Sequence, residues 1–125
     1  MNARTAPIDV LFVIAPHSLL LDIAGPAEAF RLVNLHRAIR GQPPYFRLRF
    51  AGPVATTVAS VGLPLADLEP LPKALRAPTW VVLVGQPAAH VHRATSAIFD
   101  TARWLNRVLR QHLNAPDSPH RLVTI

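Results

Sequence analysis

Two short apolar runs constrain the fold of this sequence more than any other feature. Residues 8–15 have the sequence I-D-V-L-F-V-I-A and residues 79–84 have T-W-V-V-L-V, and proline or glycine follows each run directly. A third run, R-L-V-T-I, occupies residues 121–125. Strands with apolar side chains on both faces are typical of parallel sheets that helices cover on both sides. We therefore expect a parallel sheet between two helical layers.

The segments between these runs complete the pattern. Residues 26–39 have a helical apolar stripe, and a second helix follows a cap at Thr95 or Ser96. Residues 45–51 alternate between apolar side chains and arginine, which indicates a strand near the sheet edge. Residues 54–67 predict a small hairpin, and the proline-containing residues that follow predict a connector. This order predicts a three-layer α/β sandwich with a mainly parallel sheet. The buried side of the second helix is expected to comprise Ile98, Ala102, Leu105, Leu109 and Leu113.

Composition narrows the classes of protein. The chain has 125 residues, of which half are hydrophobic and 16% are charged, so we expect one globular domain over residues 1–125 with its core from about residue 8. It has no apolar stretch of about 18 residues and no signal-peptide pattern, so we expect a cytoplasmic protein without a membrane span. The absence of cysteine excludes disulfides, thiolate zinc sites and a cysteine nucleophile within these residues.

The net charge of +6 raises the question of nucleic-acid binding. Twelve arginines and one lysine supply the positive charge, but the arginines are scattered along the chain and form no dense basic run. The sequence has no helix-turn-helix pattern and no aromatic stacking motif. A solvated, arginine-rich surface explains the charge better, and we expect these residues alone not to bind DNA.

Residues 22–30, D-I-A-G-P-A-E-A-F, place two carboxylates around a Gly25-Pro26 pair. Pro26 predicts a helix start at that position, with Glu28 in the first turn. Asp22 lies in an apolar segment, where a charge is expensive to bury without a partner. The two carboxylates either satisfy backbone amides at the helix start or belong to a functional site. The spacing favours the first interpretation for Glu28 and leaves both open for Asp22.

Two further segments are candidates for function. Gly85 and Gln86 follow a predicted buried strand, where a glycine lets the backbone approach a ligand closely or simply forms a tight turn. His90 and His92 are spaced to share a metal ion on a strand, but no third ligand is evident. We therefore expect no metal site, and the sequence indicates no cofactor.

The order of these motifs resembles the ThiJ/PfpI superfamily, which has the class I glutamine amidotransferase-like fold. The closest resemblance is to the amino-terminal domain of GlxA-type regulators of the AraC family, and it covers nearly the whole chain from Ile8. Residues 22–30 match the pattern D-x-x-G-P-x-E-x-F that follows the first strand in that superfamily. The other matches are F-A-G-P-V at 50–54, S-V-G-L-P-L at 60–65, W-V-V-L-V-G at 80–85, A-R-W-L at 102–105 and R-L-V-T-I at 121–125.

The resemblance implies a flavodoxin-like sandwich that is incomplete at its carboxyl terminus, because the nucleophile-elbow cysteine of the superfamily would follow Ile125 directly. Asp22 occupies the position of the carboxylate that hydrogen-bonds this cysteine, and Gly85 occupies the glycine turn beneath the site. The superfamily usually has Pro-Gly-Gly in that turn, whereas this chain has Val84-Gly85-Gln86. The missing second glycine restricts the backbone and argues against an oxyanion-hole role.

The resemblance further implies the amino-terminal part of a ligand-sensing and dimerisation domain of a transcription regulator. Its partners would be an unknown small-molecule effector and a second copy of the protein, and the chain itself would have no enzymatic activity. The alternatives are the amino-terminal part of an isocyanide hydratase-like or other ThiJ/PfpI enzyme, catalytically incomplete here, or an inert product of a split gene. Residues past 125 would discriminate, since two helix-turn-helix units favour the regulator. The candidate pocket residues are Asp22, Gly25, Pro26, Glu28, Gly85 and Gln86.

Overall fold

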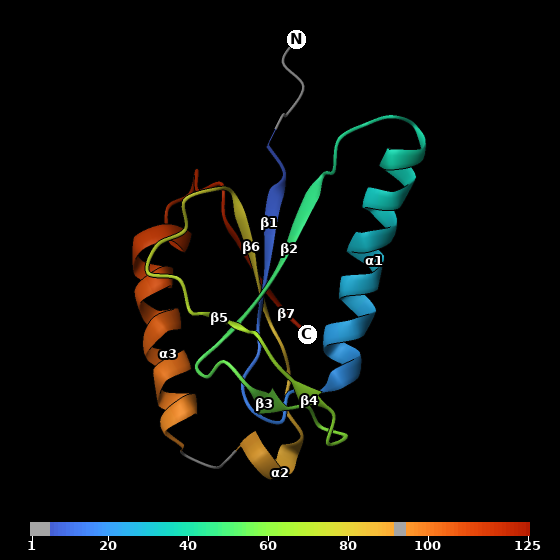
Figure 1. Cartoon of the computed structure of the whole chain (residues 1–125). Coiled ribbons are helices and arrows are strands. Elements are labelled where there is room, and N and C mark those ends of the chain that lie inside the picture. Colours follow the sequence, from blue (N-terminus) through green and yellow to red (C-terminus); the bar gives the residue numbers. More distant parts are fainter. Residues whose placement is uncertain (1–5, 92–94) are drawn as a thin grey trace.

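A five-stranded sheet forms the middle of the molecule, with the strand order β5-β2-β1-β6-β7. The computed structural model describes residues 6–91 and 95–125. All neighbouring strands of the sheet pair in parallel, as Figure 1 shows, which confirms the fold class expected from the apolar runs. The strands are β1 (Ile8–Val13), β2 (Phe46–Gly52), β5 (Glu69–Pro70), β6 (Thr79–Leu83) and β7 (Arg121–Thr124).

Helices cover both faces of this sheet and complete three layers (Figure 1). Helix α1 (Leu20–Ile39) lies on one face, and α3 (Ser96–Val108) lies on the other and continues as a short π-helix, η1 (Leu109–Leu113). The short helix α2 (Ala88–Val91) follows β6. None of the helices in the described part of the chain has the length and apolarity needed to cross a membrane.

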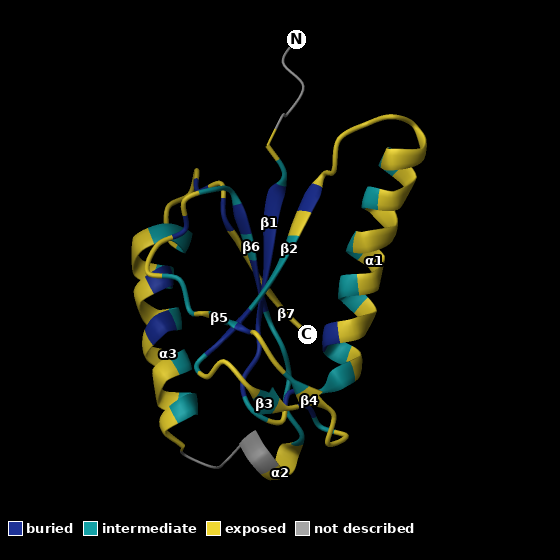
Figure 2. Ribbon diagram, in the orientation of Figure 1, coloured by how far each residue is buried: buried dark blue, intermediate teal, exposed yellow. Residues whose placement is uncertain are grey.

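Strand β1 is the centre of two hydrophobic cores because its side chains alternate between the two faces. Val10 and Phe12 pack with Ile23 on the α1 side, whereas Leu11 and Val13 pack on the α3 side. All six residues of β1 are buried (Figure 2). A fully buried side chain of this size stabilises the fold by about 1.5–3 kcal/mol, so β1 is the most strongly held element of the sheet.

The start of α1 differs from the prediction. The helix begins at Leu20, six residues before Pro26, and the Gly25-Pro26 pair lies inside it. The first amide groups of a helix lack intrahelical partners. Here the Leu19 amide donates to the Gly85 carbonyl at 2.8 Å and the Leu20 amide donates to Ser60 Oγ at 3.2 Å. These tertiary hydrogen bonds let the helix begin early, so the predicted break was wrong and Glu28 lies well inside the helix.

Helix α3 has the predicted cap but a different buried side. Thr95 Oγ1 accepts a hydrogen bond from the Ile98 amide at 3.3 Å. Trp104 and Val108 are the fully buried residues of the helix, whereas Ala102, which the prediction placed on the buried side, is exposed. The indole of Trp104 packs in the α3-side core and donates to the Pro72 carbonyl at 2.7 Å, and this contact fixes the rotation of the helix.

The predicted hairpin forms a separate two-stranded antiparallel sheet of β3 (Thr57–Val58) and β4 (Pro64–Leu65). Strand β5, which the sequence did not predict, pairs only with Ala51 and Gly52 of β2. Strand β2 is therefore close to the sheet edge, as its alternating sequence indicated.

Gly52, the last residue of β2, lies so close to the end of β1 that a Cβ atom there would overlap the carbonyl oxygen of Ile14, the residue that follows β1.

Candidate functional site

The path of the chain creates a topological switch point between β1 and β6. After β1 the chain crosses through α1 to β2 on one side, and after β6 it crosses through α3 to β7 on the other. The order β2-β1-β6-β7 is that of the first four strands of a doubly wound, flavodoxin-like sheet. Ligands of such sheets bind in the crevice beyond the carboxyl ends of the two strands where the order reverses.

Three residues far apart in sequence meet at this switch point. Asp22 Oδ2 lies 3.0 Å from the position that a Cβ atom on Gly85 would take, and the Ile125 carbonyl oxygen lies 3.3 Å from the same position. Asp22 comes from the first turn of α1, Gly85 follows β6, and Ile125 follows β7. The structure therefore brings together two of the predicted site residues, and glycine at position 85 leaves room for the carboxylate.

Hydrogen bonds between loops hold the two sides of the switch point together. The Gly85 carbonyl accepts from the Leu19 amide, as described above, and Gln86 Nε2 donates to the Pro16 carbonyl at 2.6 Å. Gly85 and Gln86, shortly after β6, thus hold the loop that follows β1. Gln86, a predicted site residue, therefore holds this loop through its side-chain amide group.

The same loop is also tied to the hairpin. The His17 amide donates to the Val58 carbonyl at 2.8 Å, and the Ser60 amide donates to the Ser18 carbonyl at 2.9 Å. His17 has a φ of 67°, a left-handed conformation that is uncommon for residues other than glycine and that recurs at functional sites. Ser18 is fully buried and donates its hydroxyl to the Ala15 carbonyl at 2.7 Å.

The Asp22 carboxylate has unused capacity to accept hydrogen bonds. Among the described residues, none donates a hydrogen bond to it or forms an ion pair with it. It is half-buried in the first turn of α1, where the helix dipole favours a negative charge. Chemically, this is a positioned acceptor that a ligand N–H, O–H or ammonium group can approach.

A small cavity of about 190 Å³ lies between the loop that follows β1, Gln86 and the start of α3. Pro16, His17 and Gln86 form one wall, and the amino-terminal residues of α3 from Thr95 form the other. Neither Asp22 nor Gly85 lines this cavity, and its volume is below the range of about 300–1,000 Å³ that is usual for small-molecule pockets.

The remaining predicted residues lie elsewhere. Glu28 is exposed and pairs with Arg31 Nη2 at 2.6 Å on the same helix. Gly25 is exposed with no atom within 4 Å of a Cβ position, and Pro26 is half-buried inside α1. In residues 6–91 and 95–125 no three histidine, aspartate or glutamate side chains are grouped for metal binding. His92 lies outside the described residues, and the side chain of His90 is not described.

Sequence reasoning missed His17, Ser18 and Ser60, which build the loop contacts of the site. The signal for the first two was present. Two polar residues follow the most apolar strand of the chain directly after Pro16, at the carboxyl end where sites of this fold lie. Ser60 had no comparable signal, because its contact with Leu20 depends on how the hairpin packs against the sheet.

No protein-family model and no curated protein matches this sequence. Among solved structures, the chain is similar to an AraC family transcriptional regulator from Pseudomonas putida, with a TM-score of 0.64 and 18% identity over 83% of this chain and 51% of that one. A second similar structure, the VC2308 protein, has 14% identity over 82% of this chain and 48% of that one. Its TM-score of 0.39 is too low to support an argument. The chain spans about half the length of the Pseudomonas regulator. It therefore has an α/β fold found in a transcription regulator.

Proposed function

We propose that this chain is the amino-terminal part of the ligand-sensing and dimerisation domain of a GlxA-type AraC-family transcription regulator, within the ThiJ/PfpI superfamily. The fold that it shares with an AraC family regulator supports this proposal. The observation that carries it is the uncommitted Asp22 carboxylate beside Gly85 at the switch point of the sheet. The residues act as a binding site, and the proposal assigns them no catalytic step and no cofactor.

The effector would bind beyond the carboxyl ends of β1 and β6. Asp22 would accept a hydrogen bond or ion pair from a donor group of the effector, so we expect an amine, amide or hydroxyl on that molecule. Gly85 allows close approach, and Gln86 holds the neighbouring loop in place. Gly25, Pro26 and Glu28 lie further along α1 and would contact only a part of the effector that extends along this helix.

The dimerisation part of the proposal is supported by the outer face of α1. Leu21, Leu32, Leu35 and Ile39 are all exposed, and their spacing places them on one side of the helix. Exposed apolar side chains grouped on one side of a helix, as Leu32, Leu35 and Ile39 are, are typical of interaction surfaces. We expect sedimentation of a dimer at micromolar concentration, which Leu32→Glu disrupts. Ala102→Glu, at an exposed position of α3, is the matched control and leaves the dimer intact.

The test of ligand sensing is a screen of small amines, amides and amino acids by thermal shift, followed by NMR titration of the hits. We expect at least one hit whose titration shifts the amide signals of residues 16–22 and 85–86. Asp22→Asn should weaken binding at least about tenfold, in line with the loss of an ionised acceptor. Asp117→Asn, at an exposed loop position, is the control. Hits that bind equally well to the Asp22→Asn protein would contradict the assignment.

The second candidate is the amino-terminal part of an isocyanide hydratase-like or other ThiJ/PfpI enzyme. The proximity of Asp22 to Ile125 favours it, because the resemblance places the nucleophile directly after that residue. These 125 residues contain no cysteine, so we expect them to show no turnover of an isocyanide or amide. Turnover that Asp22→Ala abolishes would favour the enzyme over the regulator.

Two further parts of the proposal concern location and DNA. We place the protein in the cytoplasm, away from membranes, as expected of a transcription regulator. The 125 residues alone should not bind a specific DNA duplex, because the arginines form no contiguous basic run and the sequence has no helix-turn-helix pattern. Weak retention of DNA that disappears at moderate salt fits the net charge of +6, whereas sequence-selective nanomolar binding would contradict the proposal.

A further inference from the structure

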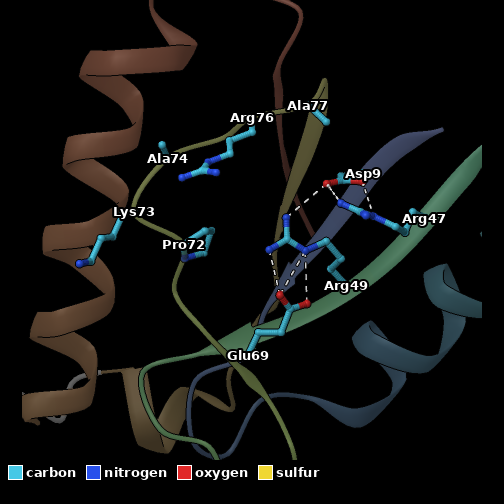
Figure 3. A pocket seen from close by; sticks show the side chains of 9 residues that line it. All are labelled: Asp9, Arg47, Arg49, Glu69, Pro72, Lys73, Ala74, Arg76 and Ala77. Atoms are coloured by element: carbon cyan, nitrogen blue, oxygen red, sulfur yellow. Dashed lines mark hydrogen bonds and ion pairs between the residues drawn. The ribbon is translucent and has the colours of Figure 1, made fainter. Parts of the chain in front are cut away.

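A second polar cleft lies on the α3 side of the sheet, away from the carboxyl ends where Asp22 and Gly85 meet. It has a volume of about 630 Å³ and lies between β1, β2 and the connector that follows β5. Six of its lining residues are charged, and Figure 3 shows how they lie around it. They are Asp9, Arg47, Arg49, Glu69, Lys73 and Arg76.

Four of these charged side chains form a network of ion pairs on the sheet. Arg47 donates from Nε to Asp9 Oδ1 at 2.8 Å and from Nη2 to Asp9 Oδ2 at 2.7 Å. Arg49 lies between Asp9 and Glu69 (Figure 3), with Nη1 3.2 Å from Asp9 Oδ2 and Nη2 2.9 Å from Glu69 Oε1. Two guanidinium groups thus neutralise two carboxylates, and the network by itself explains why a buried Asp9 is tolerated.

The network leaves two positive charges in excess. Lys73 and Arg76 are exposed on the connector, and neither forms a hydrogen bond or ion pair with another described residue. Four cations against two carboxylates give the cleft a net charge of +2. Arg47 uses Nε and Nη2 for Asp9.

The arginines of the network are also held in place before any ligand arrives. Asp9 orients Arg47 through two hydrogen bonds, and Glu69 and Asp9 together orient Arg49. A side chain fixed in this way loses little conformational freedom on binding, which favours affinity. Arg76 and Lys73 line the cleft from the connector and add positive potential there. In Figure 3 the side chain of Arg76 extends toward Ala74 and Pro72.

From these observations we infer that the cleft binds a small molecule with a doubly negative head, a phosphate monoester or a dicarboxylate, through its excess positive charge, with Arg76 as the guanidinium group that the network does not use. Planar guanidinium groups match the geometry of both phosphate and carboxylate oxygens. A dianion would neutralise the excess charge of the cleft without displacing either carboxylate of the network. Pro72, Ala74 and Ala77 supply neutral surface for the body of the ligand. The inference does not depend on the proposed regulatory function, since the two sites share no residue.

The experiment is calorimetric and NMR titration of the chain with inorganic phosphate and with succinate, in a low-salt buffer that contains neither. We expect saturable 1:1 binding of at least one probe, and the tighter probe identifies the headgroup. Added chloride at the same ionic strength should shift no amide signals of residues 47–49 and 73–77 in a saturable way. Affinity should fall as the salt concentration rises, because the site is open to solvent.

Two variants distinguish binding at this cleft from a general effect of the protein's positive charge. Arg76→Gln should weaken binding at least tenfold without changing the melting temperature of the free protein, since Arg76 has no partner in the described structure. Arg40→Gln removes an equivalent exposed charge directly after α1 and should leave the affinity within twofold. Equal weakening by both variants, saturable binding of chloride, or no binding of either probe would each overturn the inference.

Discussion

Arg47 and Arg49 provide a sharp test of how the Asp9 network stabilises the fold. The side chain of Arg47 is 60% exposed and that of Arg49 is 21% exposed, so burial alone predicts that truncating Arg49 destabilises the protein more. The geometry predicts the opposite. Asp9, whose side chain is 4% exposed, receives two short hydrogen bonds from Arg47 and one longer bond from Arg49.

The magnitudes follow from what each truncation leaves behind. Arg47→Ala leaves the buried Asp9 carboxylate with one contact at 3.2 Å. Losing one partner of a fully buried pair costs about 3–5 kcal/mol, and solvent access at Arg47 reduces this to about 2 kcal/mol. Arg49→Ala leaves Asp9 its bidentate partner and releases Glu69, which is 44% exposed, to water. We expect that change to cost about 1 kcal/mol, the usual net value of a hydrogen-bonded contact.

The assay is equilibrium unfolding in urea, with the free energy of unfolding extrapolated linearly to water for each variant. The double variant Asp9→Asn with Arg47→Ala isolates the cause, because it also removes the unpaired charge. Its loss should fall short of the sum of the two single losses by more than about 0.5 kcal/mol, the limit for independent sites. A larger loss for Arg49→Ala than for Arg47→Ala, or additive losses in the double variant, would refute this reasoning.

Three further predictions concern single positions. Asp22→Ala should change the free energy of unfolding by no more than about 0.5 kcal/mol, measured in urea, because no partner is lost; a loss of several kcal/mol would contradict its assignment to a ligand site. Gly52→Ala should lose about 1–3 kcal/mol, visible as a lower melting temperature, since the added methyl group overlaps the Ile14 carbonyl. Burial, with His112 nearby, lowers the pKa of His120 below its ordinary value of 6.5. At acidic pH the unfolded chain then binds more protons than the folded one. The contribution of His120 to stability is therefore complete above about pH 6.5 and is lost as the pH falls through the folded-state pKa. His120→Gln should flatten this pH dependence of the free energy of unfolding, measured by urea titration at several pH values.

The parallel sheet could be predicted because its signal is local. The runs at residues 8–15 and 79–84 are apolar on both faces, which is typical of strands in a parallel sheet that is covered on both sides. The start of α1 could not be predicted in the same way. Its first amides are satisfied by Ser60 and Gly85, which lie 40 or more residues away, so propensity at Pro26 pointed to the wrong boundary.

The candidate site was predicted to the extent that topology determines it. In a parallel sheet the carboxyl ends of the strands share one edge, so the segments that leave β1, β6 and β7, including the start of the helix that follows β1, lie near one another. This is why Asp22, Gly85 and Ile125 meet. Glu28 shares the motif with Asp22, but its place on α1 depends on where the helix begins, and that was set by contacts distant in sequence.

The Asp9 cleft was missed for a related reason. The alternation of Arg47 and Arg49 with apolar residues indicated a face open to water, and Asp9 had no partner nearby in sequence. The structure instead places these side chains on the same face of β1 and β2, under the connector that carries Arg76. Pairing between strands 38 and 40 residues apart therefore converts a solvated pattern into an ordered network.

Asp9 and Asp22 show how the roles of two carboxylates can be separated on physical grounds. Asp9 lies near the start of β1 and Asp22 lies after the loop that follows it, so the same rigid strand supports both. Asp9 is buried and fully hydrogen-bonded, which is what a group that stabilises the fold requires. Asp22 is held at the switch point with no donor among the described residues, which contributes little to stability and leaves the group available for a ligand. Asp9→Asn should therefore reduce the free energy of unfolding by at least about 1 kcal/mol and leave effector binding intact. Asp22→Asn should do the reverse, and equal effects of the two substitutions on stability would remove the basis for treating Asp22 as a site residue.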